Sequence, residues 1–278
     1  MDIKYIISKI KNSEIEKIKD PVSVEEPLEM RLKFKKDNEW VSQNISITMR
    51  TPGSDEDLIR GFLLNEKIIE NVNKITSIEQ IGDPVGDYNL KNIIEATIDD
   101  TKNLEIGKLK RNFVTNSSCG VCGKTSLDAI KIIKNEKLDL NFPKLKKEII
   151  VKSPELLRNM QSEFAKTGGI HASALIDISG NTIALKEDVG RHNALDKLIG
   201  FSHYNKLIDN NSQFIACSGR LNFELVQKAL MSDIGIMVGV GAPTSLAIDL
   251  AKRFDMTLVG FAKSDSFNIY CNENRVII

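Results

Sequence analysis

The sequence predicts an α/β protein in two parts, a smaller β-rich unit over residues 20–110 and a larger α/β unit over residues 111–278. The second unit alternates strand-like and helix-like segments, a pattern typical of a largely parallel sheet with helices on its faces. The first unit shows period-two alternation of apolar residues, which indicates strands. The chain has 278 residues, 41% of them hydrophobic and 27% charged, and is long enough to bury a core without disulfide bonds.

Composition and charge argue against several functional classes. The 38 Lys and Arg residues balance 38 Asp and Glu residues, so nucleic-acid binding has no electrostatic support. No apolar run approaches the roughly 18 residues that a membrane span requires. The first twenty residues interleave isoleucine with charged residues and contain no signal-peptide core. We therefore expect a cytoplasmic protein that binds neither nucleic acid nor membrane.

The elements of the first unit follow from local patterns. We interpret residues 1–20 as a polar lead-in. Alternation over residues 24–49, interrupted by the turn-forming sequence KKDNE, predicts a β-hairpin. Ser54 followed by Asp57 has the form of a helix N-cap with an acidic first turn, and apolar residues then recur on one helix face. Two further strands are predicted at Ile75–Ile81 and Ile93–Ile98.

The second unit opens with an apolar segment near residue 111, a helix over 127–133 and a linker over 139–148. Ser153-Pro154-Glu155 has the form of a helix start, and Gly168-Gly169 the form of a helix stop. Strands and helices then alternate. The predicted strands are 171–178, 181–187, 214–217, 234–240 and 256–261, and the predicted helices begin at Asn193, Phe223 and Thr244.

Two of the four cysteines form a C-x-x-C motif. Cys119 and Cys122 lie in the segment SSCGVCGK, which has the character of a glycine-rich loop leading into a helix. Free backbone N–H groups and the positive end of the helix dipole would favour a thiolate there, and Lys124 adds a cation. The pattern predicts an exposed, reactive thiol.

Four interpretations of the pair compete: two small apolar residues in a turn, a structural zinc site, a thioredoxin-like dithiol, and a sulfur relay that carries a persulfide. Structural zinc usually needs two more close ligands, which the spacing of Cys217, Cys271 and the histidines does not offer. The zinc-deaminase signature fails, because Ser118 replaces its proline and Ser173 its glutamate.

Three other segments combine small residues with a predicted helix start after a strand. They are residues 187–193, 218–220 and 239–245, and the first two contain Arg191 and Arg220. Helix N-termini at the carboxyl edge of an α/β sheet bind anions, so these segments predict a phosphorylated ligand. No Walker sequence is present. His192 is interpreted as either a catalyst or a capping group paired with Asp188, and His203 as a surface residue.

Seven sequence blocks resemble, in order, those of the FdhD/NarQ family of formate dehydrogenase accessory sulfurtransferases. The match runs from about residue 20 to the end of the chain, and the C-x-x-C and EDVGRHNALDK blocks are its most specific parts. The blocks are TPGSDEDLIRGFLLNEKII, SSCGVCGKTSL, TGGIHASAL, EDVGRHNALDKLIG, SGRLNFELVQKAL, GAPTSLAIDLA and LVGFAKSDSFNIY.

The resemblance implies a three-layer, cytidine-deaminase-like domain with a mixed sheet and no deaminase zinc site, beside the smaller β-rich domain. It implies a cytoplasmic sulfurtransferase that carries persulfide sulfur from a cysteine desulfurase to the molybdenum (or tungsten) bis-pyranopterin guanine dinucleotide cofactor. The cofactor would then enter the catalytic subunit of formate dehydrogenase. A homodimer that binds no metal of its own is also implied.

By position, the resemblance implies that Cys119 holds the persulfide, with Cys122 as its partner in the loop. It also implies that one segment contacts the guanine dinucleotide end of the cofactor, namely Phe261, Ala262, Lys263, Ser264, Asp265 and Ser266. The chain departs from the family pattern at Leu221-Asn222, Gly241 and Lys263, where two serines and an arginine are expected. Two alternatives stay open: a cofactor chaperone with structural zinc at the cysteine pair, and a dithiol oxidoreductase.

Overall fold

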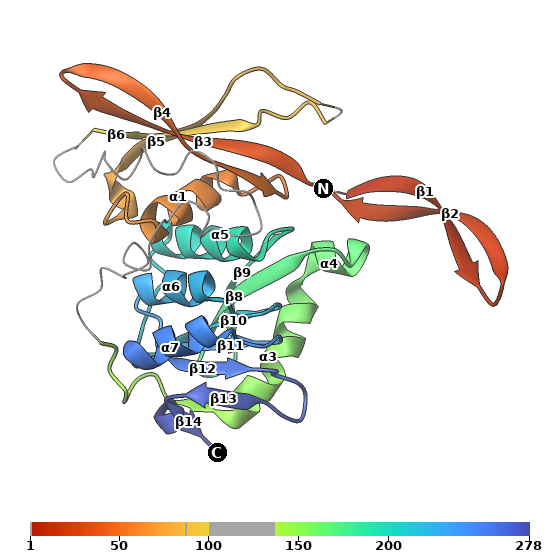
Figure 1. The fold of residues 1–278 in the computed structure, drawn as a ribbon, viewed down its shortest axis with the longest axis vertical. Coiled ribbons are helices and arrows are strands. Elements are labelled where there is room, and N and C mark those ends of the chain that lie inside the picture. Colours follow the sequence, from red (N-terminus) through yellow and green to blue (C-terminus); the bar gives the residue numbers. More distant parts are fainter. Residues whose placement is uncertain (1, 87, 100–136) are drawn as a thin grey trace.

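The computed structural model describes residues 2–86, 88–99 and 137–278. The C-x-x-C pair Cys119 and Cys122, the predicted helix over 127–133 and the predicted unit boundary at residues 110–111 lie outside the described residues. The α/β class is confirmed, and Figure 1 shows a β-rich part stacked on a larger α/β part.

The first part contains strands β1 to β6 and one α-helix. Its elements are β1 (Asp2–Lys11), β2 (Glu14–Ser23), β3 (Glu26–Lys36), β4 (Glu39–Arg50), α1 (Asp55–Asn65), the 3-10 helix η1 (Val72–Lys74), β5 (Ile75–Ile81) and β6 (Ile93–Ile98). The larger part contains β7 (Leu145–Lys146), α3 (Lys147–Met160), α4 (Ser162–Thr167), β8 (His171–Asp177), β9 (Thr182–Asp188), α5 (Arg191–Tyr204), β10 (Gln213–Cys217), α6 (Phe223–Met231), β11 (Ile236–Gly239), α7 (Ser245–Arg253), β12 (Thr257–Gly260), β13 (Asn268–Cys271), η3 (Glu273–Arg275) and β14 (Val276–Ile277).

Four strands of the first part form a sheet of order β4-β3-β6-β5. Strand β3 alternates as predicted and buries Leu28, Met30, Leu32 and Phe34 on the face that packs against α1. The predicted β3–β4 turn is confirmed at Asp37-Asn38, where both residues have positive φ. The helix after Ser54 is also confirmed, although Ser54 makes no side-chain capping bond and its hydroxyl instead accepts a hydrogen bond from Lys186.

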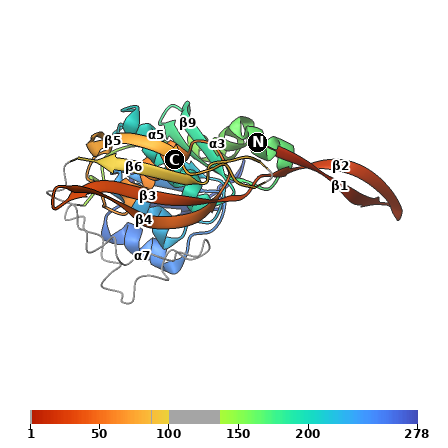
Figure 2. The same cartoon turned by 90° about the horizontal axis from the view of Figure 1, so that it is seen from above.

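The interpretation of residues 1–20 as a lead-in without structure is wrong. Strands β1 and β2 form a ten-residue antiparallel hairpin that projects from the body (Figures 1 and 2). Its turn residues Asn12 and Ser13 both have positive φ, as a two-residue hairpin turn requires. Isoleucines placed on both faces conceal the alternation that marks a half-buried strand, which is why the pattern gave no strand signal.

The larger part is a three-layer structure around a six-stranded sheet of order β13-β12-β11-β10-β8-β9. Helices α5, α6 and α7 cover one face and α3 covers the other (Figure 1). Alternate residues of β10 supply the two cores, because Ile215 faces the three-helix side whereas Phe214 and Ala216 face α3. The three layers and the mixed sheet agree with what the resemblance implies.

Strand direction in this sheet differs from the largely parallel arrangement that the alternation predicts. Only β10, β11 and β12 run parallel, whereas β8, β9 and β13 pair antiparallel with their neighbours. The β8–β9 connection is a short turn at residues 178–181, and a short turn joins antiparallel strands. The parallel strands are the ones separated by helices.

The predicted helix start at Ser153 is wrong. Helix α3 begins at Lys147, inside the predicted linker, and Pro154 lies within it. A proline removes the N–H that would bond to the carbonyl group four residues earlier, here that of Ile150. The Ser153 hydroxyl donates to this carbonyl oxygen at 2.7 Å, which explains how the helix accommodates Pro154. The predicted stop is confirmed at Gly168, where φ is +68°.

The two parts meet where α1 crosses α5. A Cβ atom at Gly61 would lie 1.9 Å from the carbonyl oxygen of Asp196, and one at Gly200 would lie 2.0 Å from that of Asp57. The two helix backbones therefore touch, and only glycine fits at either position. This contact sets the β-rich sheet beside the helix layer of the larger part.

Candidate functional site

The segments that sequence reasoning selected for anion binding lie along one edge of the six-stranded sheet. Strands β9, β10, β11 and β12 all end there, and β8 begins there, since His171 pairs with Asp188 and Ser173 with Cys217. The predicted cofactor segment 261–266 follows β12 at the same edge. We call this the carboxyl edge, and it is where open α/β sheets bind ligands.

Glycines allow the loops of the carboxyl edge to pack backbone against backbone. A Cβ atom at Gly241 would lie 2.8 Å from the backbone nitrogen of Arg220, and one at Gly260 would lie 3.2 Å from the carbonyl oxygen of Gly241. At Gly239 it would lie 2.7 Å from the Leu221 side chain. The departures from the family pattern at Leu221 and Gly241 thus belong to one tightly packed arrangement.

Backbone hydrogen bonds hold these loops in a row. The N–H of Val240 donates to Cys217 at 3.0 Å, and the N–H of Gly241 donates to Gly219 at 3.2 Å. The N–H of Phe261 donates to Gly241 at 3.2 Å, which links the third loop to the second. Segments more than forty residues apart in sequence therefore form one continuous surface.

The cofactor segment predicted from the resemblance is mostly exposed. Phe261 is 43% exposed and has φ +52°, a backbone conformation that is strained for a residue other than glycine. The N–H of Lys263 donates to the carbonyl oxygen of Ser266 at 2.8 Å and closes a turn in which all four residues are exposed. Ala262 is buried and anchors the segment, with its N–H donating to Gly239 at 3.1 Å.

Helix N-termini and cations give the carboxyl edge its electrostatic character. Helices α5 and α7 begin here without a side-chain cap, at Gly190 and Thr244, so the N–H groups of their first turns have no capping side chain. Arg220 and Lys263 are exposed and make no ion pair with any described residue. Unpaired positive groups beside open helix N-termini suit a phosphorylated ligand.

Two histidines and an arginine lie where β8 meets α5 and α6. Burial, reinforced by the nearby charges of Arg191 and His192, lowers the pKa of His171 from its usual value, so His171 is neutral at pH 7. The His192 ring contacts Glu224 at 3.0 Å and the Asn222 amide group. The interpretation that His192 pairs with Asp188 is wrong, because its partners come from α6.

Half of the EDVGRHNALDK block has a different role, which sequence reasoning missed. Asp188 is fully buried, pairs with Lys197 at 2.7 Å and accepts the N–H of Thr51 at 3.1 Å. Lys197 donates to the carbonyl oxygen of Thr51 at 2.7 Å, and Asn193 donates to that of Met49 at 2.8 Å. These residues fasten the loop after β4 to α5, and the pattern of charges alone did not reveal it.

The two described cysteines are structural. Burial raises the pKa of the Cys217 thiol to about 11, and its neighbour is the Ser173 hydroxyl at 3.5 Å. Burial likewise raises the pKa of Cys271, which is 8% exposed. Neither thiol has the access or the acidity of a nucleophile. The reactive-thiol prediction therefore stays with Cys119 and Cys122, outside the described residues.

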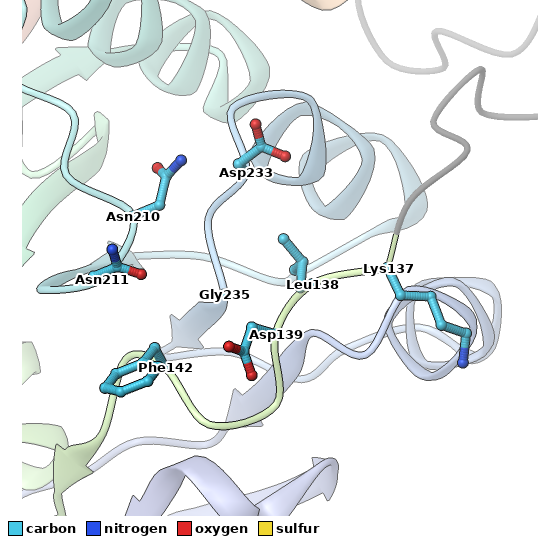
Figure 3. A pocket seen from close by; sticks show the side chains of 8 residues that line it. All are labelled: Lys137, Leu138, Asp139, Phe142, Asn210, Asn211, Asp233 and Gly235. Carbon is cyan, nitrogen blue, oxygen red and sulfur yellow. The ribbon is translucent and has the colours of Figure 1, made fainter.

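A polar pocket lies at the opposite edge, where β10 and β11 begin (Figure 3). Its lining residues are Lys137, Leu138, Asp139, Phe142, Asn210, Asn211, Asp233 and Gly235. Asp139 and Asp233 make it unsuitable for an anion. Among the described residues, no group of three or more His, Cys, Asp or Glu could hold a metal ion. No helix in that part of the chain is long and apolar enough to cross a membrane.

His203 is less exposed than its interpretation as a surface residue suggests. It is half-buried, its ring lies 3.0 Å from the Ser232 hydroxyl, and burial lowers its pKa. It lies in the last turn of α5, away from the carboxyl edge. It therefore contributes to packing and has no place in the site.

The fold and the site define a three-layer α/β protein whose carboxyl edge presents open helix N-termini and unpaired cations to an anionic ligand. The profile of the FdhD/NarQ family matches residues 24–277, and the chain belongs to that family. The chain is 39% identical to a sulfur carrier protein FdhD of Saccharolobus solfataricus, over 98% of this chain and 97% of that protein. It is 40% identical to one of Picrophilus torridus, over 94% and 93%.

A solved structure shares the fold. It is the crystal structure of a protein from Desulfotalea psychrophila assigned as a formate dehydrogenase accessory protein, with a TM-score of 0.71 over 99% of both chains. The two sequences are 21% identical, so this likeness concerns the fold alone.

Proposed function

We propose that this protein is a sulfur carrier that moves persulfide sulfur from a cysteine desulfurase to the molybdenum bis-pyranopterin guanine dinucleotide cofactor. The cofactor, its substrate, then enters the catalytic subunit of formate dehydrogenase. The protein acts as a cytoplasmic homodimer and as a sulfurtransferase. Family membership and the names of its relatives support the sulfur-carrier role. The carboxyl edge supports the anionic substrate.

The observation that carries the proposal is the convergence of four loops on one edge with unpaired positive groups. The substrate has phosphates and a guanine base, and the edge offers the N-termini of α5 and α7 beside Arg191, Arg220 and Lys263. Lysine meets a phosphate as a point charge, so Lys263 performs the electrostatic part of an arginine's role without its bidentate geometry. The exposed ring of Phe261 offers a stacking face for the base.

The sulfur step needs a thiolate. Cys119 attacks the terminal sulfur of the donor's persulfide, a new S–S bond forms on Cys119, and the donor cysteine leaves as a thiolate with the electron pair of the broken S–S bond. One sulfur atom moves and no external oxidant or reductant is used. Cys122 stabilises the persulfide or releases it by attacking Cys119. The buried, weakly acidic thiols of Cys217 and Cys271 do not compete.

Mass spectrometry after incubation with a cysteine desulfurase and free cysteine tests this proposal. Unchanged protein is expected to gain sulfur at Cys119 or Cys122, and Cys119→Ala to lose nearly all of that gain while it stays folded. Cys271→Ala is the matched control and should load normally. Full loading of Cys119→Ala would refute the role of Cys119.

The same samples decide between the proposal and its two alternatives. Stoichiometric zinc at the cysteine pair would favour a cofactor chaperone. Reduction of insulin disulfides that depends on both cysteines would favour a dithiol oxidoreductase. Sulfur loading without either result supports the carrier.

A further inference from the structure

The β1–β2 hairpin is the part of the molecule with the least packing. Its isoleucines Ile6, Ile10 and Ile15 are 72%, 71% and 71% exposed. Its base is attached to the body beside α4, where the hydroxyls of Ser23 and Thr167 lie 2.6 Å apart. A two-stranded ribbon alone is at best marginally stable in water, and three or more strands are needed for independent stability. The hairpin therefore lacks neighbouring strands.

Strand β1 presents a free sheet edge. It runs ten residues without a proline or a bulge and carries Ile3, Tyr5, Ile6, Ile7 and Ile10. Proteins usually protect such an edge with proline, charge or a bulge. Strand β2 has this protection, because Pro21 cannot donate a ladder hydrogen bond. The unprotected edge is thus that of β1, and it is the edge open to another strand.

We propose that this edge pairs with the same edge of a second copy of the chain, antiparallel and about a two-fold axis at Ile6. The result is one four-stranded sheet of order β2-β1-β1-β2 shared by the two copies. The interface is isologous, as in most dimers of identical chains. It supplies the homodimer with an interface and does not depend on the sulfur chemistry.

The register follows from the geometry of antiparallel pairing. Residues whose N–H and C=O groups point outward from one strand alternate along it, so a symmetric pair can be centred on a residue but not between two residues. Centring on Ile6 places Ile6 opposite its own copy and Tyr5 opposite Ile7 of the second copy. The three central pairs are then wholly apolar.

Neighbouring registers are less favourable, and charge supports the same choice. Centring on Tyr5 brings Lys4 into the central pairs, and centring on Ile7 brings Ser8 into them. With Ile6 at the centre, Lys4 faces Ser8 and Lys9 faces Ile3 of the second copy, so no lysine lies opposite a lysine. Aromatic and β-branched cross-strand pairs stabilise a sheet, and like charges destabilise it.

The test is the oligomeric state of the full chain, measured by sedimentation equilibrium for unchanged protein, Ile6→Lys and Ile15→Lys. The control is matched, because Ile15 is as exposed as Ile6 and lies on the same face but in β2. Ile6→Lys places two lysines against each other at the axis and is expected to raise the dissociation constant of the dimer about a hundredfold. Ile15→Lys should dimerise almost as unchanged protein does.

A crosslink checks the register independently. Ile6→Cys in a Cys119→Ser/Cys122→Ser background should be joined across the axis by a short bismaleimide, and Ile15→Cys in the same background should not. Circular dichroism confirms that each variant is folded. A monomeric unchanged protein, a dimer that Ile6→Lys leaves intact, or equal crosslinking at both positions would overturn the proposal. Sulfur loading is measured separately, so failure of either proposal is distinguishable from failure of the other.

Discussion

The carboxyl edge and the contact between α1 and α5 treat charged groups in opposite ways. At the helix contact the charges are buried and paired, as in Asp188 with Lys197 and Asp196 with Lys228, each at 2.7 Å. At the edge, Arg220 and Lys263 are exposed and have no ionic partner among the described residues. The buried pairs hold the two parts of the molecule together, whereas the exposed cations stay available to a ligand.

One segment serves both regions by alternating its residues. Asp188, Asn193 and Lys197 point to the loop after β4, while Arg191 and His192 belong to the carboxyl edge. The segment therefore couples the position of the β-rich part to the floor of the site. A sequence block this specific does not have to be explained by ligand contacts alone.

The largest expected effect comes from breaking the buried side of the comparison. Lys197→Met removes the cation beside Asp188, which is fully buried and whose pKa burial already raises. Leaving one partner of a buried pair uncompensated costs about 4 kcal/mol. Urea denaturation should show this loss in the free energy of unfolding.

A double variant sharpens that prediction. Asp188→Asn/Lys197→Met removes both charges, so it should be more stable than Lys197→Met alone, because no buried charge is left unpaired. If Lys197→Met unfolds at the same urea concentration as unchanged protein, the pair does not hold the two parts together, and the comparison between the two regions fails.

A smaller effect of opposite sign is expected at the edge. Phe261 has positive φ, which glycine adopts without strain, so Phe261→Gly should stabilise the fold by about 1 kcal/mol. The same change removes an exposed ring and should weaken the binding of guanosine diphosphate. Thermal unfolding and calorimetric titration measure the two quantities. Lower stability together with unchanged affinity would show that Phe261 is a packing residue.

Local patterns predicted most of the fold. Helix α6 begins at Phe223 as its N-cap residue Asn222 and apolar spacing indicate, and β5 and β6 have the predicted bounds. The errors have physical causes. Ser153 resembles a cap because a hydroxyl that satisfies a backbone carbonyl inside a helix has the same sequence signature as one at its start. Strands β13 and β14 are too short for period-two alternation to appear.

The candidate site was predictable only in part. Strand ends followed by helix starts identified three anion-binding segments, and the sheet brings all three to one edge. The buried role of Asp188 was not predictable, because it depends on the loop at Thr51, more than a hundred residues away in sequence. The glycine contacts between Gly241 and Arg220 likewise exist only in the folded chain.

The central claim is that the carboxyl edge binds the anionic guanine dinucleotide, and hydrogen–deuterium exchange with guanosine diphosphate as the probe tests it most directly. The account predicts slower exchange at residues 239–245 and 261–266, no change across α1 and α5, and loss of the protection in Arg220→Ala/Lys263→Ala. Protection confined to other segments, or unchanged exchange at the edge with the nucleotide in large excess, would contradict it.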